Sequence, residues 1–196
     1  CHALGAKVGN TPIGLTGRLG MFSFYVTKLI TSGGHGGAII SKELNLIKKI
    51  RDYINFDQRR DDKKRFNFQM TEIQAAIGNS QLKKLPSFLK KREEIFNCYK
   101  KAGINLLDIK KKDKGKIYPV RYRAVMVTNK QKQIIKFLKS KKISSIIPLE
   151  KWELLGNPSN YPNSLKISKQ TVSLPIYPSL KKREQKLIIE NLKKFI

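Results

Sequence analysis

Residues 23–37, SFYVTKLITSGGHGG, are the part of the chain whose residue types and spacing could do chemistry. Lys28 ends an apolar run and precedes a glycine-rich turn. A lysine on a rigid element can form a Schiff base with a carbonyl compound once its amine has lost its proton, which desolvation and cationic neighbours favour. Ser23 and Thr27, with the N–H groups of the turn, could hold phosphate oxygens. Spacing alone favours a simpler interpretation, in which Lys28 is one surface lysine among many.

The turn contains four glycines, which we interpret as turn and close-approach residues rather than as ligands: Gly33, Gly34, Gly36 and Gly37. They do not form a P-loop, which needs a Lys-Ser/Thr pair at the start of a helix. The GxGxxG dinucleotide pattern also fails, because Ile39 occupies its last position. The histidine between the glycines is given no role.

The segments around the lysine predict the elements that position it. Residues 21–28 and 38–40 are strand-like and flank the glycine turn, so a hairpin is the simplest geometry. Residues 42–54 have the periodicity of an amphipathic helix, and the polar residues 55–70 predict a long loop. A capping box beginning at Thr71 predicts the start of the next helix.

Strands and helices alternate in the rest of the chain. Pro86 is expected to end or bend the helix, with Ser87 capping a following helix that closes at Gly103. The later segments are predicted as strands at 117–128, 143–147 and 171–176, helices at 130–142 and 181–195, and a loop at 156–163. This alternation predicts an α/β fold. We place a domain boundary near residue 104, which divides the chain into domains 1–103 and 104–196.

The chain is strongly basic, with 41 Lys and Arg against 14 Asp and Glu and a net charge of +27. Such an excess suggests nucleic acid or an anionic membrane as a partner. Most of the excess is lysine scattered through every helical segment, whereas phosphate and base recognition favour arginine. A compositional bias of the source proteome is therefore the preferred explanation, and nucleic acid is not expected as a partner. No apolar run approaches the ~20 residues of a membrane span, so no membrane is expected either.

Cysteine is sparse and shows no metal-ligand spacing, because Cys1 and Cys98 lie far apart. We therefore expect no metal site and a reducing, hence cytoplasmic, compartment. The opening residues CHALGA (1–6) are typical of the interior of a fold, so we expect the chain to be part of a longer protein.

Four segments resemble those of a known family and occur in the same order. Residues 23–37 are similar to the lysine signature of the DegT/DnrJ/EryC1/StrS sugar aminotransferases, which use pyridoxal 5'-phosphate (PLP) and belong to the fold-type I aminotransferase superfamily. CHALGA (1–6) and SLPIYPSL (173–180) resemble two further elements of that family. RFNFQMTEIQAAIGNSQLKKL (65–85) resembles its helix entry N-x-x-M-x-x-x-x-A-A-x-G-x-x-Q-L, with every fixed position matched.

The resemblance implies a fold and residue roles. The fold would be α/β, the C-terminal part of a PLP-dependent transferase large domain followed by a small α/β C-terminal domain. Lys28 would carry PLP as a Schiff base and move a proton between substrate and cofactor, and Ser23 would hydrogen-bond the cofactor phosphate. His2 would lie against the PLP ring or its phenolic oxygen, or be a structural histidine. Asn67 would reach the phosphate of the partner subunit's cofactor in a homodimer, or be a helix-entry turn residue.

The function implied is transfer of an amino group from glutamate to a nucleotide-linked keto-sugar, and the sequence does not identify the sugar. The aspartate that protonates the pyridine nitrogen would fall just before Cys1, and without it the ring is a poor electron sink. We therefore expect the chain to describe part of an enzyme and not to be competent alone. Two alternatives stay open: a non-catalytic or split fragment of such an enzyme, and a Lys-rich module that binds polyanions or nucleic acid.

Overall fold

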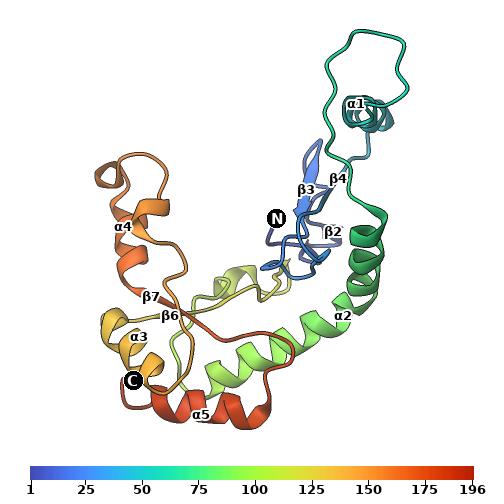
Figure 1. Cartoon of the computed structure of the whole chain (residues 1–196). Helices are drawn as coiled ribbons and strands as arrows, with labels where there is room; N and C mark the ends of the chain where they lie inside the picture. The colour runs from blue at the N-terminus through green and yellow to red at the C-terminus, as the bar shows by residue number, and fades with distance from the viewer. The chain divides into compact units, whose positions relative to one another are not determined.

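The computed structural model describes residues 1–196, apart from the side chain of Pro158. The chain forms two compact units of mixed α and β structure, which agrees with the α/β class expected (Figure 1). Unit 1 comprises Cys1–Phe88 and Lys110–Val120, and unit 2 comprises Leu89–Ile109 and Arg121–Ile196. The assignment of residues 1–103 and 104–196 to a large and a small transferase domain stays a prediction.

Unit 1 contains two small antiparallel sheets. In the first, β1 (Lys7–Val8) lies between β2 (Thr11–Pro12) and β5 (Ile117–Tyr118). In the second, β3 (Gly20–Ser23) pairs with β4 (Gly37–Ile40), and Ser23 pairs with Gly37. This pair confirms the expected hairpin. The first strand ends at Ser23 rather than at residue 28, because the Ser23 hydroxyl accepts the Tyr25 N–H and starts a turn.

Two helices begin in unit 1, close to where the sequence indicates, and the second continues into unit 2 after Phe88. Helix α1 (Leu44–Ile54) follows β4, and helix α2 (Glu72–Lys101) follows the segment 55–70. The capping box is present, since Thr71 Oγ1 accepts the Gln74 N–H at 3.3 Å and Gln74 Oε1 accepts the Thr71 N–H at 3.0 Å. The segment 55–70 is irregular, as expected, and Arg65 holds it to α1 through a 3.0 Å ion pair with Asp52.

Helix α2 continues through Pro86, so the expectation of a second helix capped by Ser87 is wrong. Proline removes one backbone donor, but the Ser87 hydroxyl simply donates to the Lys84 carbonyl at 2.7 Å within the helix. Buried side chains such as Leu85 hold the helix by packing, which outweighs the loss of one hydrogen bond. The helix closes at Gly103, as expected: this residue has φ +83° and the Ile104 N–H donates to the Tyr99 carbonyl.

Unit 2 packs its helices around the antiparallel pair β6 (Ala124–Val127) and β7 (Thr171–Leu174). Besides the second half of α2, its helices are α3 (Gln131–Ser140), α4 (Pro162–Lys169) and α5 (Lys182–Leu192). Single 3-10 turns are η1 (Lys111–Asp113) in unit 1, and η2 (Lys151–Glu153) and η3 (Pro158–Asn160) in unit 2. The main hydrophobic core lies in this unit and includes the fully buried Tyr99, Ile134 and Leu138.

Three sequence predictions for the second half need correction. The single strand at 117–128 is two strands, β5 and β6, separated at Pro119, which has no N–H to donate to a sheet. Residues 143–147 contribute only a bridge between Ile146 and Ser173. The loop at 156–163 contains η3 and the start of α4, whose first residue is Pro162, a favourable residue for a first helical position.

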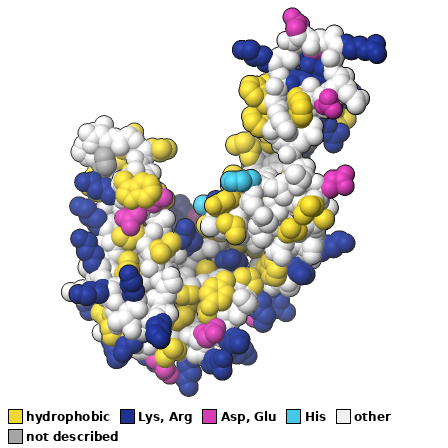
Figure 2. Space-filling model, viewed as in Figure 1, with side chains coloured by type: hydrophobic (Ala, Val, Ile, Leu, Met, Phe, Trp, Pro, Cys, Tyr) yellow, Lys and Arg dark blue, Asp and Glu magenta, His cyan; other side chains and the backbone are white. Residues whose placement is uncertain are grey.

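Lys and Arg side chains are dispersed over the visible surface of both units rather than gathered in one patch (Figure 2). Within the described part of the chain, no helix combines the length and the apolar character that crossing a membrane requires.

Candidate active site

Lys28 lies in the connection between β3 and β4, which we call the lysine loop (residues 24–36). Its backbone N–H donates to the Tyr25 carbonyl at 2.9 Å, and its side chain is half-buried. The two residues that follow, Leu29 and Ile30, are buried and anchor the loop in unit 1. The lysine is therefore held on an anchored turn rather than on an exposed helix face.

Ser32 fixes the shape of the lysine loop from inside. It is fully buried, its N–H donates to the Phe24 carbonyl at 3.0 Å, and its hydroxyl donates to the His35 carbonyl at 3.1 Å. Phe24 in turn donates its N–H to the Gly36 carbonyl at 2.7 Å. No role for Ser32 was predicted from the sequence. A serine before two glycines does indicate a turn, but nothing in the local pattern shows that its side chain is buried.

The glycines of the lysine loop pack directly on the start of α2. Gly33 has φ +78°, and a Cβ there would come within 2.9 Å of Ile77 Cδ1. A Cβ on Gly36 would lie 2.7 Å from Met70 Sδ and would overlap the Ser32 hydroxyl. These glycines are close-approach residues, as the sequence suggests. The segment 65–85 therefore supports the loop that carries Lys28.

The structure brings Lys28 and His2 together, although they are 26 positions apart: Lys28 Nζ lies 2.9 Å from His2 Nε2. A protonated lysine can only donate, so in that state Nε2 accepts and the imidazole proton sits on Nδ1. A neutral amine can also accept, which allows the other tautomer. The hydrogen bond between the two side chains can therefore have either direction, with Lys28 Nζ as the donor or as the acceptor.

The other two expected site residues are placed differently. Ser23 ends β3, five residues before Lys28, and its oxygen accepts the Tyr25 N–H at 3.3 Å. Its own hydroxyl proton stays available to donate to an anion. Asn67 is exposed in the segment before α2, and no hydrogen bond joins its side chain to the lysine loop among the described residues. The described residues therefore link Lys28 to His2 directly, but not to Asn67.

The donor set suits a carbonyl compound that carries a phosphate. No carboxylate of the described residues lies within ion-pair distance of Lys28. The hydroxyl of Ser23 supplies a donor of the kind that phosphate takes. Among the residues with described side chains, no group of three His, Cys, Asp or Glu could hold a metal ion.

Comparison with known proteins identifies the family. Residues 1–193 match the model of the DegT/DnrJ/EryC1/StrS aminotransferase family, and the chain belongs to it. The uncharacterised protein MJ1066 of Methanocaldococcus jannaschii is 30% identical over 225 residues, which cover all of this chain and 58% of the relative. The UDP-4-amino-4,6-dideoxy-N-acetyl-beta-L-altrosamine transaminase of Campylobacter jejuni is 35% identical over 134 residues, 61% of this chain and 35% of the relative.

The fold is shared with solved structures. The PLP form of Spr1654 from Streptococcus pneumoniae superposes with a TM-score of 0.84 at 24% identity, covering 99% of this chain and 55% of the other. At this identity the likeness shows the fold alone. The chain spans little more than half the length of MJ1066 and of Spr1654.

Proposed function

We propose that the protein containing this chain is a PLP-dependent aminotransferase that moves an amino group from glutamate to a nucleotide-linked keto-sugar. The observation that carries the proposal is the 2.9 Å contact between Lys28 Nζ and His2 Nε2, within a lysine loop supported by the family's helix entry. Residues 1–103 would be part of the PLP-binding large domain and residues 104–196 the small C-terminal domain. The reducing, cytoplasmic compartment expected from the sequence is part of the same proposal; Cys1 and Cys98 are both free and exposed.

The residues present fit PLP as a cofactor. PLP, when bound, supplies a carbonyl carbon that takes up amines and a ring that accepts electrons. Lys28 Nζ would bind the carbonyl carbon of PLP, and the Ser23 hydroxyl would donate a hydrogen bond to the PLP phosphate. His2 would orient Lys28 Nζ and keep its proton available for return to the substrate. The anchored loop keeps the amine in place, because Ser32 and the close-packed glycines leave it little freedom.

The substrate class follows from relatives and from charge. The Campylobacter relative is named as a transaminase of a UDP-linked amino sugar. A nucleotide-linked sugar carries a diphosphate, and the net charge of +27 would raise its local concentration near the protein. This attraction is long-range and does not choose the sugar.

Covalent trapping tests the role of Lys28. The full-length protein is incubated with PLP, reduced with borohydride and digested, and the peptides are weighed. We expect the phosphopyridoxyl group on the peptide that contains Lys28. Lys28→Arg should abolish this label and the transamination activity, whereas Lys42→Arg, at an exposed lysine of the same unit, should change neither. A protein that retains PLP and carries its label elsewhere contradicts the proposal.

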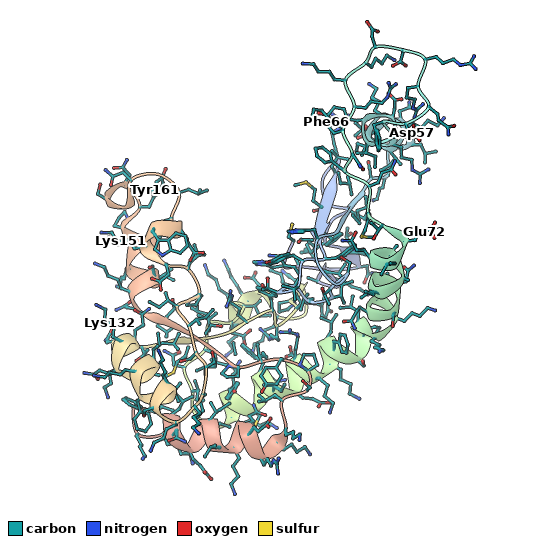
Figure 3. All side chains as sticks on the ribbon, in the orientation of Figure 1. Asp57, Phe66, Glu72, Lys132, Lys151 and Tyr161 are labelled. Atoms are coloured by element: carbon teal, nitrogen blue, oxygen red, sulfur yellow. The ribbon has the colours of Figure 1, made fainter. Side chains whose placement is uncertain are left out.

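We further propose a homodimer in which Asn67 acts on the partner subunit's cofactor. Asn67 is exposed beside a group of exposed aromatic rings, Tyr53, Phe66 and Phe68, whose neighbouring centroids lie 5.1 and 5.3 Å apart (Figure 3, Phe66 labelled). Unit 1 also leaves Leu44 and Ile73 more than 70% exposed, and apolar side chains on this scale favour burial in an assembly.

Mixed dimers test this arrangement. Lys28→Arg and Asn67→Asp subunits are each expected to be inactive as homodimers. If Asn67 acts across the dimer, a mixed dimer has one complete site, with Lys28 from one subunit and Asn67 from the other, and activity returns on mixing. If Asn67 acts within its own subunit, every site in the mixed dimer lacks one residue and the mixture stays inactive, which would refute the arrangement.

A further inference from the structure

Unit 2 contains a cavity of about 640 Å³ that the aminotransferase proposal does not use. It is bounded by residues 141–146 after α3, by the end of β7 and residues 175–177, and by one face of α5. All of its lining residues belong to unit 2, whereas Lys28 and His2 belong to unit 1. Its volume lies in the range of small-molecule sites, which run from about 300 to 1,000 Å³.

The lining of the cavity combines apolar side chains with groups that can donate hydrogen bonds to an anion. Arg123 lines it, half-buried, and its guanidinium donates to the Ser173 hydroxyl at 3.3 Å. No carboxylate of the described residues pairs with Arg123. Glu184 also lines the cavity, but its carboxylate accepts the Lys181 N–H at the start of α5. Arg123 therefore keeps donors free on a partly desolvated guanidinium, where charge-assisted hydrogen bonds are strong.

Ser145 also lines the cavity, and its hydroxyl is a second polar group beside Arg123. Its oxygen is buried and has no hydrogen-bond partner among the described residues. A buried hydroxyl without a partner is costly, and such groups are normally satisfied by protein, water or a ligand. A ligand oxygen in the cavity would satisfy it once the Ser145 side chain turns its hydroxyl towards the cavity.

Lys142 shows that the backbone is strained at the cavity wall. It has φ +58°, a left-handed conformation that favours glycine, in the position after α3 where glycine usually ends a helix. The Lys142 N–H donates to the Lys139 carbonyl, and the Ile143 N–H to the Leu138 carbonyl, so this helix end is well formed. A lysine here places a cation at the cavity at the expense of backbone conformation, and such strain is concentrated at ligand sites.

We propose that this cavity binds a small amphiphilic anion, with a carboxylate or phosphate head on Arg123, Lys142 and Ser145 and an apolar body against α5. The wall that would take the body includes Ile146, Leu187 and Ile188. Leu187 and Ile146 are each about half exposed, at 49%, so a ligand there removes apolar surface from water. The head would satisfy the Ser145 hydroxyl and the free guanidinium donors together.

Calorimetric titration of the full-length, PLP-saturated protein tests the site. The probes are 3-phenylpropionate and phenyl phosphate, with 3-phenylpropanamide lacking the charge and acetate lacking the body. We expect one site per chain for at least one acid, and the tighter acid identifies the head group. The amide and acetate should bind at least about tenfold more weakly, since each lacks one of the two interactions.

Three variants separate binding from folding. Arg123→Gln should weaken the tighter acid about tenfold or more, because a charge-assisted bond is lost. Lys142→Gly and Ser145→Ala should weaken it several-fold while leaving the Tm unchanged or raised, since one relieves the left-handed backbone and the other removes an unsatisfied hydroxyl. The matched control is Lys132→Gln, an exposed lysine of α3 outside the cavity, which should bind like the parent (Figure 3).

Two results would overturn the proposal. One is the absence of saturable binding by both acids, which would mean that the cavity takes no such ligand or is covered in the full-length protein. The other is equal weakening by Lys132→Gln and by Arg123→Gln, which would show only general attraction to a cationic surface. PLP labelling at Lys28 is measured separately, so failure at this cavity leaves the aminotransferase proposal intact.

Discussion

Replacing Gly36 with alanine should damage the lysine loop without touching the lysine itself. The added Cβ would lie 2.7 Å from Met70 Sδ and would overlap the hydroxyl of the fully buried Ser32. Ser32 cannot move aside without giving up its hydrogen bond to the His35 carbonyl. Forcing a methyl group into a packed interior costs about 1–3 kcal/mol, and a lost hydrogen bond about 1 kcal/mol more. We expect Gly36→Ala to lower the free energy of unfolding by roughly 2–4 kcal/mol.

Gly17→Ala is the matched control, because a Cβ there meets only the Leu19 carbonyl, at 3.8 Å. This variant should stay within about 1 kcal/mol of the parent, on the stabilising side if it changes at all. Urea unfolding followed by circular dichroism measures both variants, and borohydride labelling with PLP reports on Lys28. Gly36→Ala should lose label at PLP concentrations that saturate the control. If the two variants unfold and label alike, the close packing inferred at Gly36 is wrong.

Three further changes test other parts of the chain. Burial alone would raise the pKa of Asp108, but hydrogen bonds from Lys100 and Arg121 lower it to about 2. The ionised Asp108 carboxylate therefore stabilises the fold by about 2 kcal/mol above pH 4, and this stability is lost as the pH falls towards 2. Asp108→Asn should remove this part of the pH dependence of the free energy of unfolding, measured with urea. Arg65 has a side chain only 5% exposed and joins α1 to the segment 55–70, so Arg65→Gln should speed proteolysis within that segment while trypsin sites elsewhere keep their rates. The Gln131 side-chain amide donates to the Ser168 and Thr171 carbonyls at 2.6 and 2.7 Å. Gln131→Ala should therefore lower the free energy of unfolding by about 2 kcal/mol in thermal unfolding. A smaller loss than that caused by Lys132→Ala, at an exposed position, would contradict this prediction.

Local signals predicted the elements whose ends depend on local chemistry. The capping box at Thr71 and the glycine at residue 103 mark the ends of α2 correctly, and apolar periodicity found α1, α3 and α5. The failures occur where distant packing decides. Pro86 predicts a break that tertiary packing overrides, and residues 117–128 look like one strand although their two ends pair in different sheets. No local pattern can show which partner a short strand will find.

The candidate site also combines residues that motifs in the sequence indicate with contacts that only the fold creates. Spacing alone left Lys28 among many surface lysines, and only the resemblance selected it. The contact with His2 joins residues 26 positions apart, so it depends on the fold and on no periodicity. Ser32 was missed because its burial comes from α2, which begins 40 residues later. Asn67 and Ser23 stay predictions, since they are proposed to act on groups outside the described residues.

The order of segments in the two units has a consequence for how genes of this kind can exchange parts. The chain passes from one unit to the other after Phe88, after Ile109 and after Val120. No single recombination break therefore separates the units, because any one cut leaves at least one unit with a foreign piece. A chimera that takes unit 2 from a relative must import two segments and keep residues 110–120 between them, so that β5 still pairs with β1. Diversification by substitution within the chain is then more accessible than diversification by swapping whole units.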